Sequence, residues 1–141
     1  MYNDRTSIKE NFDERVIFLK TSIEKQCVDN PDKGQVMGEI LCYMLNNIEN
    51  SDLSQPYISE KFGMSVSSLN RMFKSFTNRT YVDILSMMRL KKMLELLESG
   101  TLRDRDIGEQ IGITDPHYLS IWFKKMTGIS VTEYRKAKSN A

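Results

Sequence analysis

The sequence predicts an all-α protein, and three observations support this fold class. Apolar residues recur at steps of three and four along most of the chain, which is the period of a helix with one buried face. No segment alternates polar and apolar residues as a half-buried strand would. Part of the chain also repeats itself after about 50 residues, and such a period indicates two copies of one small structural unit.

Length and composition indicate one domain with a short appendage. The chain has 141 residues, of which 40% are hydrophobic, enough for one core. No run approaches the roughly 18 apolar residues of a membrane span, and the first residues lack the pattern of a secretory signal. The two cysteines, Cys27 and Cys42, fit a reducing compartment better than a disulfide scaffold. We therefore expect a cytoplasmic protein with no membrane contact and with both thiols in the core.

Charge is unevenly distributed along the chain. The net charge is only +1. Residues 1–50 contain six Lys and Arg against nine Asp and Glu, whereas residues 51–141 contain fourteen against ten. A phosphate-binding surface, if present, is therefore expected in the second part of the chain.

Residues 1–34 predict a helical extension. Its apolar positions follow helical spacing and are Ile8, Phe12, Val16, Leu19, Ile23 and Cys27. The polar cluster at residues 29–34, with Pro31 and Gly34, is expected to end this helix. A second helix is predicted from about Gln35 to Asn50, with a buried side made of Val36, Met37, Ile40, Leu41, Met44, Leu45 and Ile48.

The rest of the chain contains a duplicated pattern. At an offset of 49, Leu53, Ile58, Phe62 and Gly63 match Leu102, Ile107, Ile111 and Gly112. At an offset of 50, Phe73, Lys74 and Asn78 match Phe123, Lys124 and Gly128. A long helix at about 80–99, ended by Gly100, is predicted between the copies. The sequence thus predicts two units, at about 53–76 and about 102–126, joined by a linker helix.

Each unit has the features of a helix-turn-helix. Gly63 and Gly112 supply the turn, where a positive φ favours glycine. A small residue four positions earlier, Ser59 or Gly108, leaves room for the second helix to cross the first. An N-cap for the second helix is predicted at Ser65 in the first unit and at Thr114 or Asp115 in the second. One such match is weak, but two at the repeat spacing predict a tandem helix-turn-helix domain with two subdomains.

The exposed residues after each N-cap are the candidate DNA contacts. The start of the second helix of a helix-turn-helix meets base edges in the major groove. The base-facing candidates are Ser67, Ser68, Asn70 and Arg71 in the first unit, and His117, Tyr118 and Ser120 in the second. Phosphate contacts are predicted for Lys74, Lys124 and Lys125. The linker helix of about 20 residues would span ~30 Å, close to the ~34 Å turn of B-DNA.

Residues from about Gln35 to Lys138 resemble the DNA-binding domain of the AraC/XylS family. The resemblance is carried by GMSVSSLNRMFKSF, by MRLKKMLELLESG in the linker helix and by IGEQIGITDPHYLSIWFKKMTGISVTEYRKA. It implies seven helices, two reading helices on one side of DNA, and no catalysis. Carried over by position, it implies base contacts from Ser67, Asn70 and Arg71 and from His117, Tyr118 and Ser120.

The chain departs from the family pattern at several positions. Ile113 replaces the usual Phe and Leu119 replaces an aromatic residue, and both changes preserve apolar packing. Met93 stands where a small residue is common, and Val131 where Pro is usual. Ile121 occupies a position often held by Arg, which removes a donor and predicts weaker base reading by the second unit.

Enzymatic and metal-binding functions find no support in the sequence. His117 is the sole histidine, so a metal site of His and Cys ligands is not expected. There is no GxSxG elbow that would expose a catalytic serine, and no glycine-rich phosphate loop. We predict no enzymatic activity, no cofactor and no metal. Glu133, Tyr134 and Arg135 are expected to stabilise the C-terminal turn and not to touch DNA.

The predicted function is sequence-specific binding of double-stranded DNA, which would change the recruitment of RNA polymerase at nearby promoters. The alternative is a protein-interaction module that binds another regulator or RNA polymerase and contacts DNA weakly; Ile121 and the low net charge favour it. Residues 1–34 are predicted to be a linker packed on the domain. In the alternative interpretation they belong to an effector-sensing or homodimerisation region.

Overall fold

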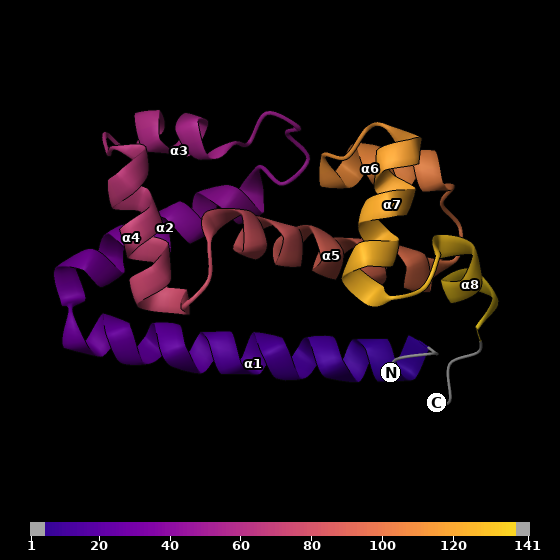
Figure 1. Cartoon of the computed structure of the whole chain (residues 1–141), viewed down its shortest axis with the longest axis horizontal. Coiled ribbons are helices and arrows are strands. Elements are labelled where there is room, and N and C mark those ends of the chain that lie inside the picture. Colours follow the sequence, from indigo (N-terminus) through magenta and orange to yellow (C-terminus); the bar gives the residue numbers. More distant parts are fainter. Residues whose placement is uncertain (1–4, 138–141) are drawn as a thin grey trace.

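The computed structural model describes residues 5–137, and every regular element in that range is a helix (Figure 1). The eight helices are α1 (Arg5–Asp29), α2 (Pro31–Asn46), α3 (Gln55–Lys61), α4 (Val66–Thr77), α5 (Tyr81–Ser99), α6 (Asp104–Ile111), α7 (Pro116–Thr127) and α8 (Val131–Lys136). The predicted all-α class is confirmed. The start predicted for the N-terminal extension, residue 1, and the end predicted for the DNA-binding domain, residue 138, lie outside the described residues.

Helix α5 joins two groups of helices. In Figure 1, α2–α4 gather at one end of α5 and α6–α8 at the other, while α1 runs alongside both groups. The buried residues of α5 are Tyr81, Ile84, Leu85, Met87, Leu90, Met93, Leu94 and Leu97. Thr80 caps its start and Gly100, in the left-handed conformation, ends it. The predicted linker helix is thus confirmed, and its apolar side chains form the part of the core that both groups share.

The two turns have the same backbone geometry. Gly63 has a φ of 65° and Gly112 a φ of 79°, values that strain any residue with a Cβ atom. The same hydrogen bond closes each turn: the Met64 N–H donates to the Ser59 carbonyl (2.8 Å), and the Ile113 N–H donates to the Gly108 carbonyl (3.0 Å). A Cβ atom on Gly108 would clash with the Ile113 carbonyl, which is the close helix crossing that the repeat predicted.

The ends of α4 and α7 also match. In each, a buried threonine hydroxyl donates to the carbonyl of a phenylalanine one turn earlier and accepts from the backbone two residues later. Thr77 does this between Phe73 and Arg79, and Thr127 between Phe123 and Ile129. The residue after each threonine, Asn78 or Gly128, adopts the left-handed conformation. The duplication therefore extends to individual hydrogen bonds.

Arg89 on α5 lies where the two units meet. Its Nη2 donates to the Asn50 carbonyl at 3.0 Å, in the loop before α3. A Cβ atom on Gly112 would lie 2.8 Å from the same nitrogen and 2.6 Å from the Ile48 carbonyl oxygen. Burial lowers the pKa of Arg89. The turn of the second unit thus packs directly on the loop of the first, with the Arg89 guanidinium between them.

The boundary between α1 and α2 differs from the prediction. The break expected over residues 29–34 is a single residue, Asn30, and α2 begins at Pro31 instead of Gln35 and ends at Asn46 instead of Asn50. Pro31 fits the first turn of a helix, where its missing N–H needs no partner. Gly34 allows α2 to pack closely on α1, because a Cβ atom there would lie 3.0 Å from the Cα atom and the Sγ atom of Cys27.

Two residues of α2 that we expected in the core are exposed. Cys42 and Leu45 are exposed, and Cys27 is only partly buried. The buried stripe of α2 is formed by Met37, Ile40 and Met44. Cys42 lies about 200° around the helix from Ile40, given roughly 100° per residue, and therefore points away from the core. The predicted core position of Cys42 is wrong.

The paired turns provide a test of close packing at the junction of the units. We expect Gly63→Ala to cost about 1–2 kcal/mol of unfolding free energy, because only the positive φ is strained; no atom lies within 4 Å of its added Cβ. Gly112→Ala carries the same strain and also overpacks against Ile48 and Arg89, which adds about 1–3 kcal/mol. Urea unfolding of both variants measures the difference. Equal losses would contradict the close approach at Gly112.

Candidate nucleic-acid interface

The second helices of both units, α4 and α7, point in the same sense. In Figure 1 each begins beside the preceding helix at the same edge of the molecule and runs toward α1 or α8. Ser65 caps α4, its hydroxyl accepting from the Ser68 N–H at 3.0 Å. Asp115 caps α7, its carboxylate accepting from the His117 N–H at 3.0 Å. Of the two caps predicted for the second unit, the structure has Asp115 and not Thr114.

Each of these helices separates a buried apolar side from an exposed polar side. The buried sides are Leu69, Phe73 and Phe76 in α4, and Leu119, Trp122 and Phe123 in α7. The exposed predicted contacts are Ser67, Asn70, Arg71, Lys74, His117, Tyr118, Ser120, Lys124 and Lys125. The structure thus leaves all of the predicted side chains except Ser68 open to a ligand. The apolar substitutes Ile113 and Leu119 are buried, as expected.

Ser68 differs from the other predicted contacts. It is half-buried, and its hydroxyl accepts from the Ser65 hydroxyl at 2.9 Å and from Arg71 Nη2 at 3.2 Å. The side chain therefore links the N-cap of α4 to the guanidinium of Arg71. This arrangement restricts the rotamers of Arg71 and leaves its remaining N–H groups exposed.

Asn70 has a partner that the sequence did not indicate. Gln55, at the first position of α3, donates from Nε2 to Asn70 Oδ1. An amide oxygen has two lone pairs, so the Asn70 oxygen retains one acceptor site and its NH₂ group retains both donors. No helical spacing connects residues 55 and 70, and only the folded turn brings them together.

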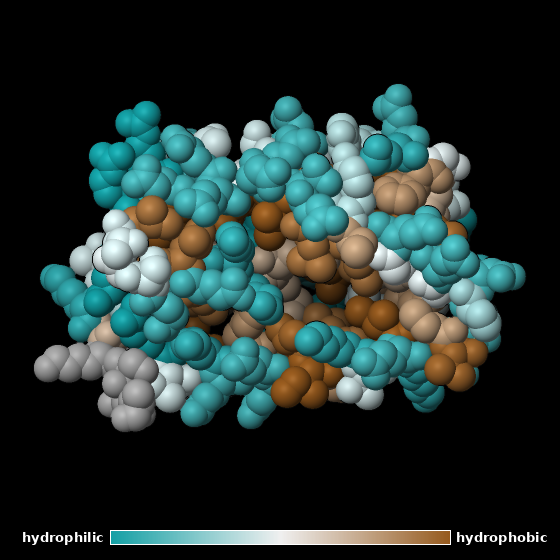
Figure 2. Space-filling model, turned by 180° about the vertical axis from the view of Figure 1, so that it is seen from behind, coloured by the Kyte–Doolittle hydropathy of each residue, from teal (hydrophilic) through white to brown (hydrophobic). Residues whose placement is uncertain are grey.

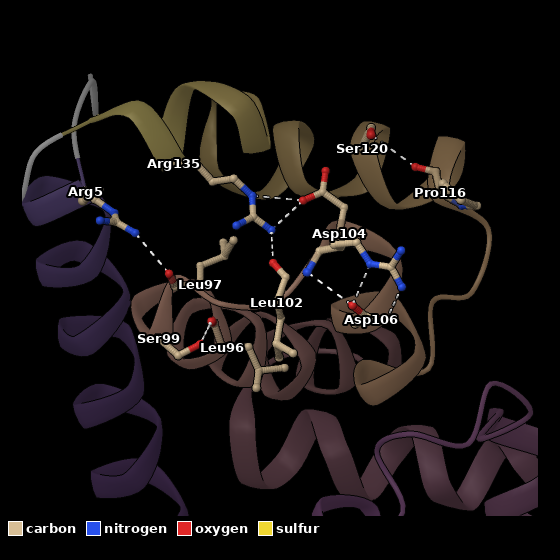
Figure 3. Close-up of polar contacts among 11 residues, drawn as sticks. Arg5, Leu96, Leu97, Ser99, Leu102, Asp104, Asp106, Pro116, Ser120 and Arg135 are labelled. Carbon is tan, nitrogen blue, oxygen red and sulfur yellow. Dashed lines mark hydrogen bonds and ion pairs between the residues drawn. The ribbon is translucent and has the colours of Figure 1, made fainter.

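The exposed side of α7 is less polar than that of α4. Tyr118, one of the expected base contacts, is 55% exposed, and Ile121 next to the expected contact Ser120 is 54% exposed. The Ser120 hydroxyl donates to the Pro116 carbonyl of its own helix at 3.1 Å (Figure 3). Its donor is therefore already used. With the Ser120 hydroxyl bonded and an apolar side chain at Ile121, this side of α7 retains the His117 ring and the Tyr118 hydroxyl as hydrogen-bonding groups.

The C-terminal residues stabilise the second unit through contacts with the start of α6. Arg135 donates to the Leu102 carbonyl at 2.8 Å and to the Asp104 carboxylate at 2.7 Å, bridging α8 to the start of α6 (Figure 3). Tyr134 is buried, and burial raises its pKa to about 12. The structural role expected of Tyr134 and Arg135 is confirmed. Ser130 and Glu133 form the capping box of α8. Hydrogen bonds from the Ser130 backbone N–H and hydroxyl lower the pKa of Glu133.

Comparison with known proteins places residues 58–137 in a family described as "Helix-turn-helix domain". The chain is 24% identical to "Histidine kinase P4" of Formosa agariphila, over 96% of this chain and 10% of that protein. It is 32% identical to the "HTH-type transcriptional activator RhaR" of Mannheimia succiniciproducens, over 61% of this chain and 33% of that protein. The chain spans a tenth to a third of the curated relatives it matches.

A solved structure has the same fold over most of the chain. The C-terminal domain of the two-component response regulator yesN from Fusobacterium nucleatum superposes with a TM-score of 0.70 and is 28% identical. The match covers 72% of this chain and 99% of that domain. Among the helices of residues 5–137, none combines the length and the apolar content that a membrane span requires.

The duplicated unit, its two exposed second helices and the matched family define a DNA-binding domain of the kind that regulates transcription. Within that class, the chain belongs to the helix-turn-helix domain family of the AraC/XylS type. The family consists of DNA-binding domains and not of enzymes.

Ser65, which precedes α4, and Ser67, in its first turn, allow the N-cap to be tested. We expect Ser65→Ala to lower the free energy of unfolding by about 0.5–2 kcal/mol, because the Ser68 N–H loses its acceptor. Ser67→Ala is the matched control, since Ser67 is exposed, and should change stability by less than about 0.5 kcal/mol. Urea unfolding followed by circular dichroism gives both values. An equal effect of the two substitutions would contradict the assignment of the cap.

Proposed function

We propose that this chain binds specific sequences of double-stranded DNA through α4 and α7 and thereby regulates the start of transcription at nearby promoters. One observation carries the proposal: the same helix-turn-helix occurs twice, and each copy exposes the polar side of its second helix next to an N-cap. Two reading helices that start at one edge of the molecule can enter successive major grooves on one side of a duplex.

In the first unit, Asn70 and Arg71 are proposed to read bases. An asparagine amide can pair with adenine through two hydrogen bonds, and an arginine guanidinium can do so with guanine. Gln55 orients the amide of Asn70 from α3, and Ser68 orients the guanidinium of Arg71. We therefore assign Ser68 a positioning role beside the base-facing Ser67, Asn70 and Arg71.

In the second unit, His117, Tyr118 and Ser120 are proposed to face the bases. His117 stands in the first turn of α7 and is exposed. The ring of Tyr118 and the side chain of Ile121 offer apolar surface, which suits the methyl group of thymine. Lys74 of α4 and Lys124 and Lys125 of α7 are exposed one to two turns further along and are proposed to contact phosphates.

Regulation of transcription requires protein partners as well as DNA. We propose that RNA polymerase is one partner, in keeping with a relative described as a transcriptional activator, and that the protein acts in the cytoplasm, where bacterial DNA lies. Homodimerisation through the N-terminal region is also proposed. It is supported by exposed apolar residues of α1, among them Ile17 and Phe18, and by the apolar side chains on the face seen in Figure 2.

An adaptor that binds protein and only weakly contacts DNA is the second candidate. The exposed Ile121 on α7 favours it, because a base-reading helix would gain from a hydrogen-bond donor there. Membership of a DNA-binding family favours the first candidate.

Selection of bound sequences from a random DNA pool tests the two candidates directly. The proposed function predicts enrichment of a bipartite motif whose halves lie about one helical turn, roughly 10 base pairs, apart. An adaptor would enrich no common motif. A motif limited to one half would show that only one of the two units reads DNA.

Arg71 offers a test of base reading. Arg71→Ala should cost about 1–3 kcal/mol of specific binding and relax the preference at one base position. Arg71→Lys retains the positive charge but loses the two-pronged contact, and should relax the same position while preserving most of the non-specific affinity. Binding to the selected motif and to single-base variants of it measures both effects. If the lysine variant keeps the wild-type preference, Arg71 contacts a phosphate and not a base.

Salt dependence tests the contribution of phosphates. Binding should weaken linearly on a plot of log K against log salt concentration, with a slope of about −0.9 for each phosphate neutralised. Lys124→Gln should make this slope shallower by about 0.9, the value for one phosphate contact, and should leave the selected motif unchanged. An unaltered slope would remove Lys124 from the proposed phosphate contacts.

A further inference from the structure

A groove with three cationic side chains in an otherwise largely apolar lining lies between α1, α5 and α7. Its volume is about 340 Å³, and its polar lining includes Arg15 of α1, Arg79 before α5, Asp83 of α5 and Lys125 of α7. Tyr118, one of the proposed base-facing residues, lines the same groove. The groove is therefore continuous with the surface that is proposed to meet DNA, and it receives side chains from both units and from α1.

The three cations of this groove lack ion-pair partners among the described residues. Within residues 5–137, neither Arg15, Arg79 nor Lys125 forms an ion pair within 4 Å, although five other pairs occur. The one carboxylate in the groove, Asp83, is already part of the capping box of α5, where it accepts from the Thr80 N–H. Three cations face one carboxylate that already has this partner, so an anion is expected to be attracted there.

Arg15 and Arg79 also repel each other. Burial and the neighbouring Arg79 lower the pKa of Arg15, and Asp83 offsets this only in part. Two guanidiniums that line one groove with a single carboxylate repel each other, and an anion bound between them would offset this repulsion. A phosphate group accepts hydrogen bonds from more than one guanidinium.

Helix α1 holds Arg15 in place relative to both units. At one end, Arg5 donates to the Leu97 carbonyl at 3.3 Å (Figure 3) and also lies over the Tyr134 ring. Toward the other end, Ser22 donates to the Phe76 carbonyl of α4 at 3.0 Å. The Arg15 side chain thus projects from a helix that is attached to both units. This helix precedes the residues that match the family.

From this arrangement we propose that Arg15 and Arg79 together bind a backbone phosphate of the DNA strand that crosses between the two reading helices, which makes α1 part of the DNA interface. The inference rests on the proposed function, because it needs a duplex on the surface of α4 and α7. It adds a contact from outside the matched domain. The phosphate is held by position and charge, so it contributes affinity and no sequence preference.

The test compares Arg15→Gln and Arg79→Gln with Lys25→Gln in the full chain, using the DNA motif selected by the wild type. Lys25 is an exposed residue of the same helix outside the groove. Arg15→Gln should make the log–log salt slope shallower by about 0.9. A fourfold rise in salt concentration should therefore weaken DNA binding by this variant about 3.5-fold less than DNA binding by the wild type. Its selected motif should be unchanged. Lys25→Gln should behave as the wild type.

The double variant separates a shared phosphate from two independent ones. Because one phosphate bridges both guanidiniums, Arg15→Gln combined with Arg79→Gln should lose less affinity than the product of the two single losses.

The stability of Arg15→Gln is the control for folding. Because the substitution removes a like-charge repulsion, its urea midpoint should be unchanged or higher, which distinguishes a lost DNA contact from a damaged fold.

The outcomes also distinguish this inference from the proposed function. A wild type that enriches a motif, together with an Arg15→Gln variant of unchanged salt slope, overturns the contact from α1 and leaves the proposed function intact. A wild type that enriches no motif and shows no salt dependence overturns the proposed function itself.

Discussion

The contact between the Gly112 turn and the loop after α2 determines how the two helix-turn-helix units lie relative to each other. Each unit is too small to bury a core alone, and both use the apolar side chains of α5. At their junction the Gly112 backbone approaches the Ile48 carbonyl so closely that a Cβ atom would clash, and Arg89 joins the loop to α5. Because α4 and α7 extend from these units, their relative direction follows from this contact.

Helix α1 adds a second connection between the units. It packs through Ile8, Phe12 and Leu19, and its polar side chains contact the last turns of α4 and α5 and, through Tyr134, α8. A change in the position of α1 would therefore alter the environment of both units together. This coupling is physical in the sense that one rigid element contacts both sites. It does not require the reading helices themselves to rearrange.

Local patterns in the sequence were sufficient to predict the duplicated unit. Positive φ at Gly63 and Gly112, the N-cap at Ser65 and the exposed face of α4 all follow from residue type and helical spacing. The start of α2 was mispredicted, because Pro31 and Gly34 break helices in some contexts and here serve the first turn and a close contact with Cys27. The hydrogen-bond partners of Arg71 and Asn70 differ in whether the sequence could indicate them. Ser68 lies three residues from Arg71 on one helix, whereas Gln55 reaches Asn70 only through the tertiary fold.

The two reading helices differ in chemistry although they share a backbone geometry. The exposed side of α4 presents an amide and a guanidinium, each held by a neighbouring side chain, and such groups discriminate bases by paired hydrogen bonds. The exposed side of α7 presents the apolar surfaces of Tyr118 and Ile121, which suit a thymine methyl, beside the hydrogen-bonding groups of His117 and of the Tyr118 hydroxyl. Under the proposed function, the first unit supplies most of the hydrogen-bonded readout. The second unit, with Lys124 and Lys125 at its end, supplies affinity and fixes the register. A tandem protein of this kind can tolerate sequence variation in one half-site, because phosphate contacts still hold that half in place.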